Sequence, residues 1–468
     1  MKRESRGHFT GFQWRSAKRL LAPEQVEFGL RTRAQAWVFF ASLALTSLSL
    51  VYFAGKAASA ETLASFGGVA WLERAITLDP SNPLPDYQLG ALHLFSLERP
   101  DSIAAVHHLR RAAELSPNTG PYWLALAAAS ENAGDARAAQ NSIQRALERR
   151  PMSPDYWWRA ANYDLRTGQF ETAWNRFRRL LELSPGHAGL VFRICYKASG
   201  DSRVVAKKVL PPDASPALRI AYIDFLRRQG DDEGAFHVWH EMASESRQQR
   251  VTFQMSQPYL DALIADNRVD EAVAVWNSLL NSRAIRRPAG AKSRDVVFNG
   301  DFEDAPLNGG FDWHAPEMPY VLTDLQASVS YRGAKSASVD FTVKENAEYE
   351  ILYQFVPVEP RCAYRLRAFV RSESITSDSG PRLRVVDSAS PTRLEAATDP
   401  VVGTTDWHPV EMAFSTGPDT RLVRLSVWRA RSREFPTEIS GRFWIDAVSM
   451  IPLGPQGELA LTRKAALP

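Results

Sequence analysis

The sequence contains few cysteines and no common catalytic motif. Among its 468 residues there are two cysteines, Cys195 and Cys362, and they lie in different predicted domains. A disulfide framework is therefore not expected, and neither is a zinc site built on clustered cysteines. The sequence also lacks G-x-S-x-G, H-E-x-x-H and a phosphate-binding loop ending in G-K-[ST]. These absences favour a binding protein over an enzyme.

Outside the amino terminus, positive and negative side chains nearly cancel. The net charge is +3, but residues 1–33 carry eight Lys or Arg and three Glu, a balance of +5. The rest of the chain sums to −2, so the pI of 8.8 does not argue for nucleic-acid binding by the folded part. His237 and His240 share a predicted helix with Glu241, but no third metal ligand is placed beside them. We expect neither a nucleic-acid partner nor a catalytic metal.

One stretch, residues 34–55, has no charged residue at all. As a helix it would span about 33 Å, enough to cross a hydrocarbon core of about 30 Å. The basic residues before this stretch outnumber Lys56 behind it, so the positive-inside rule predicts a cytoplasmic amino terminus. The interpretation is a single-pass inner-membrane protein, with a basic cytoplasmic segment at 1–33, a transmembrane helix at 34–55 and extracytoplasmic domains behind it.

A cleaved signal peptide is the alternative, because Ala58-Ser59-Ala60 has the form of a cleavage site. However, the charged leader is longer than 30 residues, and the apolar stretch exceeds the roughly 7 to 15 residues of a signal peptide. A buried soluble helix fits less well, since the stretch is apolar on all faces. The sequence therefore favours an uncleaved anchor.

Three prolines, Pro117, Pro151 and Pro185, recur every 34 residues, and the chain between them repeats. Equivalent positions in successive repeats hold small or apolar residues: Ala105, Ala139 and Ala173; Leu109, Ile143 and Phe177; Ala112, Ala146 and Leu180. This register resembles the tetratricopeptide repeat (TPR), with its pattern W-x2-L-G-x2-Y, A-x3-F and P. The resemblance implies an α-solenoid over 60–285, in which about six units stack because a single unit cannot bury its apolar face.

In TPR proteins the variable positions on the first helix of each unit form a docking surface for a protein partner. The matching positions here are Tyr87 and Gln88 in the second unit, and Trp158, Arg159, Asn162 and Arg166 in the fourth. Trp158 follows the packing residue Trp157 and cannot point the same way on a helix, so we expect it to contact the partner. The alternative is that Trp158 packs between units.

Beyond residue 285 the apolar period changes from helical to two. Residues 286–296 form a basic linker that contains proline and glycine. Within 297–453, inward apolar positions alternate with arginine-rich ones: Tyr364, Leu366, Ala368 and Val370 alternate with Arg365, Arg367, Phe369 and Arg371. This pattern predicts an antiparallel β-sandwich. Residues 454–468 are predicted to form a flexible tail.

Motifs at both ends of the sandwich give it a family likeness. The runs are Asn299-Gly300-Asp301-Phe302-Glu303, Gly309-Gly310-Phe311-Asp312-Trp313 and Phe443-Trp444-Ile445-Asp446-Ala447-Val448. They resemble the first and last strands of galactose-binding-like jelly rolls, which include carbohydrate-binding modules. In that family a structural Ca²⁺ often ties these strands together, and the matching positions are Asp301, Glu303 and Asp446. The alternative is that these carboxylates cap turns or pair with arginines.

Glycan recognition needs aromatic rings exposed as stacking faces beside polar side chains. The candidates are Trp313, Tyr320, Tyr331, Trp407 and Trp428, although each of them can instead belong to the core. The arginines on the alternating faces would suit an acidic polymer, but a solvated face is the simpler explanation.

The order of these segments predicts a membrane-anchored, extracytoplasmic adaptor of a bacterial envelope. The solenoid would dock a protein and the jelly roll would hold a glycan, with exopolysaccharide synthesis or export as the working hypothesis. One alternative is an assembly scaffold whose jelly roll contacts only protein, and a less favoured one is an enzyme that acts on polysaccharide. Apart from a structural Ca²⁺, we expect no cofactor.

Overall fold

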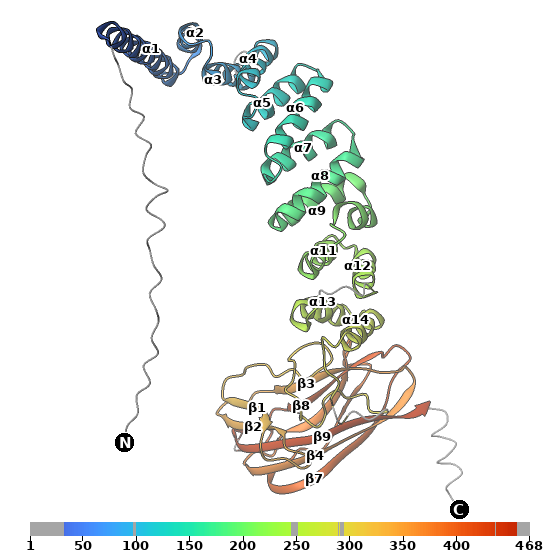
Figure 1. Ribbon diagram of the computed structural model, residues 1–468. Helices are drawn as coiled ribbons and strands as arrows, with labels where there is room; N and C mark the ends of the chain where they lie inside the picture. Colours follow the sequence, from blue (N-terminus) through green and yellow to red (C-terminus); the bar gives the residue numbers. More distant parts are fainter. Residues whose placement is uncertain are drawn as a thin grey trace, which may run out of the picture. The chain divides into compact units, whose positions relative to one another are not determined.

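The computed structural model describes residues 32–96, 100–244, 251–288, 290, 294–435 and 437–455. Almost all of the predicted basic segment and tail, and part of the predicted linker, lie outside the described residues. The chain divides into two compact units, residues 1–156 and 157–468 (Figure 1). Helices form the described part of the first unit, whereas the second contains helices followed by two β-sheets. The predicted fold class, a helical solenoid followed by an antiparallel β-sandwich, is confirmed.

Helix α1 (Arg33–Ser65) contains the uncharged stretch and continues beyond it. It begins after Thr32, whose side chain accepts a hydrogen bond from the backbone N–H of Gln35. Its middle part is exposed, with Trp37 at 76% and Leu50 at 70%, and its buried residues, Ala60 and Ala64, lie near its end. Among the described residues it is the one helix long and apolar enough to cross a membrane.

The rest of the first unit consists of helices joined by short turns. They are α2 (Val69–Leu78), α3 (Pro83–Phe95), α4 (Ser102–Leu115), α5 (Gly120–Asn132), α6 (Ala136–Arg149) and the start of α7 (Pro154–Arg166). The small residues of the repeat let paired helices approach closely, since Ala105 and Ala139 are fully buried. A methyl group on Gly90 of α3 would lie 2.6 Å from Leu109 Cγ of α4, which explains the glycine there.

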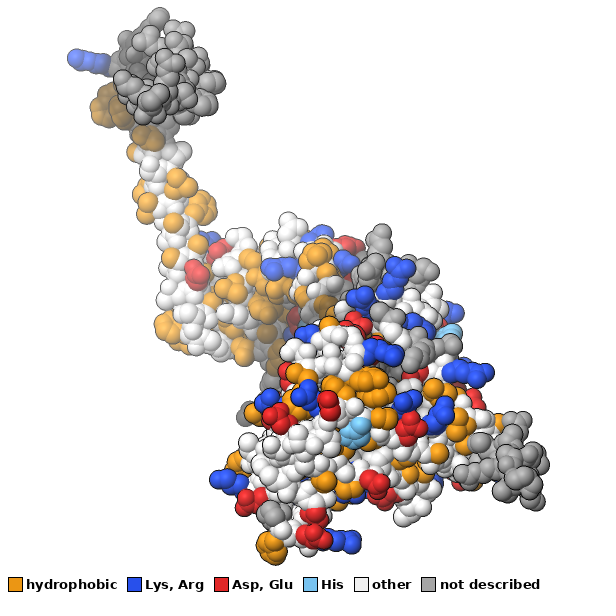
Figure 2. Space-filling model, turned by 90° about the horizontal axis from the view of Figure 1, so that it is seen from below, with side chains coloured by type: hydrophobic (Ala, Val, Ile, Leu, Met, Phe, Trp, Pro, Cys, Tyr) orange, Lys and Arg blue, Asp and Glu red, His pale blue; other side chains and the backbone are white. Residues whose placement is uncertain are grey.

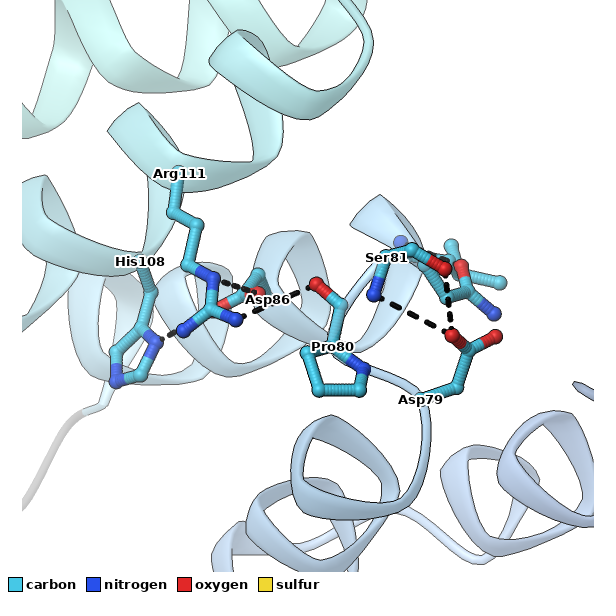
Figure 3. A network of polar contacts seen from close by, with 8 residues as sticks. Asp79, Pro80, Ser81, Asp86, His108 and Arg111 are labelled. Atoms are coloured by element: carbon cyan, nitrogen blue, oxygen red, sulfur yellow. Dashed lines mark hydrogen bonds and ion pairs between the residues drawn. The ribbon is translucent and has the colours of Figure 1, made fainter. Parts of the chain in front are cut away.

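A buried carboxylate ties α3 to α4 (Figure 3). Asp86 is fully buried; its Oδ1 lies 2.8 Å from His108 Nδ1, and its Oδ2 lies 3.3 Å from Arg111 Nε. Arg111 also donates a hydrogen bond to the carbonyl of Pro80, over 3.3 Å. The two basic side chains of α4 therefore hold both α3 and the turn that precedes it.

The second unit begins with an array of helices of its own. Its long helices after α7 are α8 (Phe170–Leu183), α9 (Ala188–Ser199), α11 (Pro216–Arg228), α12 (Asp232–Ser244), α13 (Phe253–Ala265) and α14 (Val269–Asn281). Residues 188–209 lack a long second helix: α9 is followed by α10 (Ser202–Val204) and a π-helical turn, η3 (Val205–Val209). The turns inside the pairs need a left-handed residue, provided by Gly168, Gly230 and Asn267.

The sandwich consists of two antiparallel sheets. Their strands are β1 (Val321–Ala327), β2 (Ser336–Val343), β3 (Tyr349–Pro357), β4 (Cys362–Ile375), β5 (Arg382–Asp387), β6 (Glu395–Ala397), β7 (Gly403–Ser415), β8 (Leu422–Arg429) and β9 (Ile439–Pro455). The five-stranded sheet has the order β1-β2-β9-β4-β7, and the four-stranded sheet has the order β3-β8-β5-β6. The alternation predicted for β4 is observed: Leu366, Ala368 and Val370 are buried in the core, and the residues between them face outward.

The four-stranded sheet packs against the last helix pair. Phe355 of β3 and Leu422 of β8 join the core of α13 and α14, so the five-stranded sheet lies on the side away from these helices (Figure 1). Trp276 of α14 lies edge-on to Phe298 and Phe311, with ring centroids 5.1 and 5.7 Å apart. The outer side of the four-stranded sheet and the loop before β1 thus join the core of the helices, while the interior of the sandwich forms a core of its own.

Polar contacts fix the loop that leads into the sandwich. Asp261 of α13 accepts a hydrogen bond from Gly310 N over 2.8 Å, and Gln257 donates one to the Asn308 carbonyl over 3.0 Å. Asp312, 1% exposed, accepts hydrogen bonds from the backbone N–H groups of Leu307 and Trp313. Burial raises the pKa of Asp312 to about 7, because the charged form is poorly solvated there.

Candidate functional site

The outer face of the five-stranded sheet carries three aromatic rings in contact, Tyr331, Phe369 and Trp407, which we call the aromatic cluster. Tyr331 stacks flat on Phe369, with ring centroids 3.7 Å apart and planes 8° apart. The Trp407 ring lies 6.0 Å from that of Tyr331. Tyr331 is 39% exposed and Trp407 is half-buried. Because Tyr331 covers Phe369, a ligand on this face would meet the rings of Tyr331 and Trp407.

Charged side chains surround the aromatic cluster. On the sandwich face seen in Figure 2, hydrophobic side chains are interspersed with basic and acidic ones. The guanidinium carbon of Arg367 lies 4.9 Å from the Phe369 ring, and Arg367 Nε lies 2.9 Å from Glu411 Oε1 on β7. Arg371, two residues beyond Phe369, has its guanidinium carbon 5.3 Å from the ring of Trp444 on β9. The face therefore combines stacking surfaces with hydrogen-bond donors.

Two carboxylates hold the loop that carries Tyr331. Asp446, fully buried on β9, accepts hydrogen bonds from Tyr331 N and Arg332 N, each over 2.9 Å, and its other oxygen accepts one from Ala447 N. Glu303 Oε1 accepts hydrogen bonds from the next backbone N–H groups, Ala334 N at 2.7 Å and Lys335 N at 3.0 Å. Burial raises the pKa of Asp446, and the three N–H donors oppose this.

Two of the three carboxylates matched to the calcium positions, Glu303 and Asp446, accept hydrogen bonds from backbone N–H groups, as the alternative interpretation predicts for turn caps. Among the residues described, no three Asp, Glu, His or Cys side chains are placed to hold a metal ion. Both oxygens of Asp446 accept hydrogen bonds from backbone N–H groups. Asp301 is near enough to raise the pKa of Asp446. Glu303 and Asp446 fasten a loop.

The other predicted glycan-binding aromatics lie apart from the aromatic cluster. Trp428 is on the outer face of the opposite sheet, where its Nε1 donates a hydrogen bond to Glu348 and the Arg384 guanidinium lies 4.5 Å from its ring. Tyr320, 58% exposed, immediately precedes β1. Trp313 is fully buried, stacks on Phe302 and donates its Nε1–H to the Asn299 carbonyl. The prediction for Trp313 is therefore wrong, because its ring fills the core.

In the first unit, the predicted partner-binding residues Tyr87 and Gln88 line a cavity of about 950 Å³. Its other walls come from the end of α1, from α2 and from the carboxyl end of α3. Three of the lining residues are large, apolar and exposed: Val69 at 45%, Leu92 at 43% and Phe95 at 74%. Exposed apolar surface of this kind often marks a site of protein or membrane contact. Tyr87 is fixed by the ring of Tyr122 on α5, 4.9 Å away.

The predicted partner contacts of the second unit lie on α7. Trp158 is half-buried, with its ring edge-on to Phe177 at 6.0 Å and 6.4 Å from the His187 ring. The ring therefore contacts α8 and the turn that follows it, and the rest of the side chain remains accessible. Asn162 donates a hydrogen bond to the Trp158 carbonyl, whereas Arg159 and Arg166 are exposed on the same helix.

Three residues of these surfaces, Phe369, Trp444 and Phe95, were not predicted from the sequence. Phe369 was detectable, because it is the one apolar residue among the outward arginines of β4. Trp444 lies opposite Arg371 in register, and the Arg371 guanidinium lies over its ring. The motif of the last strand, which contains Trp444, does not indicate that this ring lies on the outer face. No sequence pattern indicates that Phe95 is exposed. It is the last residue of α3, so its exposure depends on where that helix ends.

Known proteins resemble this chain in structure and not in sequence. No protein-family model matches it, and neither does any curated protein. A solved structure of YrrB, described as a TPR protein with an unusual peptide-binding site, is 19% identical, covering 36% of this chain and 79% of that one with a TM-score of 0.27. A structure of MamA is 15% identical, covering 38% and 89%, with a TM-score of 0.26.

A further similar structure is that of a carbohydrate-binding module, TmCBM61 in complex with β-1,4-galactotriose. It is 20% identical, covering 34% of this chain and 99% of the module, with a TM-score of 0.24. The chain combines a TPR-like helical array with a jelly-roll-like sandwich. At such identities and TM-scores the likenesses say nothing about function, which has to be argued from the side chains.

Proposed function

We propose that this protein is a membrane-anchored adaptor whose helical array docks a protein and whose sandwich binds a glycan. The observation that carries the glycan part is the aromatic cluster, with Tyr331 and Trp407 presented on the outer face of the five-stranded sheet. Sugar rings offer apolar faces that pack on aromatic rings, while neighbouring polar groups bind the hydroxyls. The proposal contains no catalytic step.

The protein-docking part rests on the cavity beside Tyr87 and Gln88. Its volume of about 950 Å³ suits a peptide or helix side chains from a partner, and the exposed Phe95 and Leu92 provide apolar contacts at its edge. Both surfaces would serve one purpose if the array recruits a protein to a polymer held by the sandwich.

The membrane part rests on α1 and on the charge imbalance around it. With the amino terminus in the cytoplasm, the sandwich would face the extracytoplasmic space and its polymers. An envelope polysaccharide, in its synthesis or export, is the ligand that this placement favours.

The glycan part is tested by substituting Trp407 in the full-length protein, purified in lipid nanodiscs and screened on a broad polysaccharide panel. We expect Trp407→Ala to weaken binding by about 1 to 2 kcal/mol, roughly a factor of 5 to 30, because a stacking surface is lost. Tryptophan fluorescence titration or biolayer interferometry gives the affinity, and circular dichroism checks the fold.

Trp428→Ala is the matched control, since it removes a half-buried tryptophan from the opposite sheet. We expect it to leave glycan affinity unchanged. If Trp428→Ala lowered glycan affinity and Trp407→Ala did not, the glycan site would have to lie on the four-stranded sheet. If the folded wild-type protein binds no glycan on the panel, the glycan part is wrong and an assembly scaffold becomes the better proposal.

Orientation is tested with a single accessible thiol. Both native cysteines are buried, Cys195 at 0% and Cys362 at 5%, whereas Phe435 is 95% exposed. We expect a membrane-impermeant maleimide to label Phe435→Cys in intact spheroplasts, because the sandwich would lie outside the cytoplasm. Ser5→Cys, in the basic leader, is expected to react only after lysis. The reverse pattern would contradict the proposed topology.

A further inference from the structure

Arg371 stands out among the charged residues on the outer face of the five-stranded sheet. It follows Phe369 by two residues on β4, about 7 Å along the strand, and so lies beside the aromatic cluster. Its guanidinium carbon lies 5.3 Å from the Trp444 ring, which supports the side chain. Among the described residues no carboxylate forms an ion pair with it, although it is half-buried.

Two other arginines of this face, Arg367 and Arg442, are neutralised by carboxylates. Arg367 pairs with Glu411 at 2.9 Å, and both nitrogens of the Arg442 fork contact Asp340. Glu373 lies in register opposite Arg442, and the buried Asp446 accepts backbone N–H groups. No ion pair joins Glu373 to Arg371 among the described residues, and Glu411 and Asp340 are already paired with other arginines, which leaves the fork of Arg371 available to a ligand.

A second arginine lies farther along the same strand. Arg365 is exposed, faces outward and has no ion-pair partner among the described residues. It is separated from Arg371 by six residues, about 20 Å of extended strand. A polymer lying along β4 would pass Arg365, the aromatic cluster and Arg371 in turn.

We propose that the glycan bound by this face is acidic, a polysaccharide whose sugars carry carboxylates. Arg371 binds a carboxylate through the planar guanidinium fork, which matches a carboxylate with two parallel hydrogen bonds. Tyr331 and Trp407 stack on the sugar rings, and Arg365 contacts a carboxylate farther along the polymer. This inference rests on the proposed function and adds the substrate class to it.

The test compares polygalacturonate with its carboxyl-reduced form, which has the same backbone and no charge, on the full-length protein in nanodiscs of zwitterionic lipid. We expect the acidic polymer to bind at least about tenfold more tightly, with affinity falling as salt is raised. We expect Arg371→Gln to lower affinity for the acidic polymer by about tenfold and to leave the reduced polymer unaffected. Arg393→Gln is the control, since it removes an exposed arginine from the loop between β5 and β6.

The outcomes separate the inference from the proposed function. Equal binding of both polymers, lost with Trp407→Ala, would overturn the acidic class and keep the glycan face. If Arg371→Gln and Arg393→Gln lowered affinity for the acidic polymer equally, general charge attraction would explain the binding, and the role of Arg371 would be overturned. Binding of neither polymer, while another neutral glycan binds, would also overturn the inference. If no glycan binds to the folded protein, both proposals fail.

Discussion

Trp276→Ala is expected to lower the free energy of unfolding by about 3 to 5 kcal/mol, a typical cost of deleting a buried tryptophan. The ring is 6% exposed and is surrounded by Phe253 of α13 and by Phe298 and Phe311 of the sandwich. The backbone of Gly310 lies directly against the ring, since a methyl group on this glycine would be 2.8 Å from it, so removing the ring leaves a gap between α14 and the loop. The loss of stability should therefore affect both the last helix pair and the sandwich.

Urea denaturation followed by circular dichroism measures this change, and hydrogen exchange locates it. We expect amides of both α13–α14 and β3–β8 to lose protection, because the two share one core. Trp428→Ala removes a half-buried ring of the same kind and is expected to cost about 1 kcal/mol. Loss of protection confined to the helices would show that the sandwich is independent of the array.

The second large effect is expected from Arg176→Met, which leaves a buried carboxylate without its partner. Asp164 is fully buried, and its oxygens lie 3.0 Å from Arg176 Nη1. Breaking one partner of a buried ion pair costs about 3 to 5 kcal/mol, because the remaining charge is poorly solvated. Thermal and urea unfolding of the variant measure the loss.

The pH dependence of this loss identifies its cause. Burial already raises the pKa of Asp164 to about 6 against the opposing effect of Arg176, so without Arg176 the pKa rises further. An acid with a raised native pKa stabilises the fold at low pH, and this contribution is lost as pH rises through the native pKa. The deficit of Arg176→Met should thus be smallest near pH 5 and grow towards pH 8.

Two further variants act as controls for Arg176→Met. Replacing both partners, with Asp164→Asn and Arg176→Met together, is expected to recover much of the stability, since no buried charge remains. Arg179→Ala removes a partly exposed arginine of the same helix, paired with Glu182, and is expected to cost less than about 1 kcal/mol. If Arg176→Met lost the same free energy of unfolding at every pH, lost packing rather than the buried charge would explain the loss.

The sequence predicts those features of the fold that local patterns determine. The alanines and large apolar residues of the 34-residue register specify the helix crossings, and Ala105 and Phe177 are buried as expected. The alternation along β4 specifies both its core face and its arginine-bearing face. These patterns suffice because helical and strand periods fix which side chains share a face.

Contacts between distant segments were not predictable in the same way. Whether Asp446 faces a cation or backbone N–H groups depends on a loop more than a hundred residues earlier, at Tyr331. Trp313 and Trp407 have similar polar neighbours in the sequence, yet one fills the core and the other lies on the outer face. The helix–sandwich junction pairs Asp261 with Gly310 across the predicted linker, and no local pattern indicates that pairing.

The junction also decides how a mechanical load would travel through the second unit. Asp261, Gln257 and Trp276 hold the loop at 298–314 directly, and Arg421 of the sandwich pairs with Asp270 of α14. A pull on a polymer bound to the five-stranded sheet would thus enter α13 and α14 through these contacts. These side-chain contacts would therefore share the load with the covalent chain that joins α14 to the sandwich.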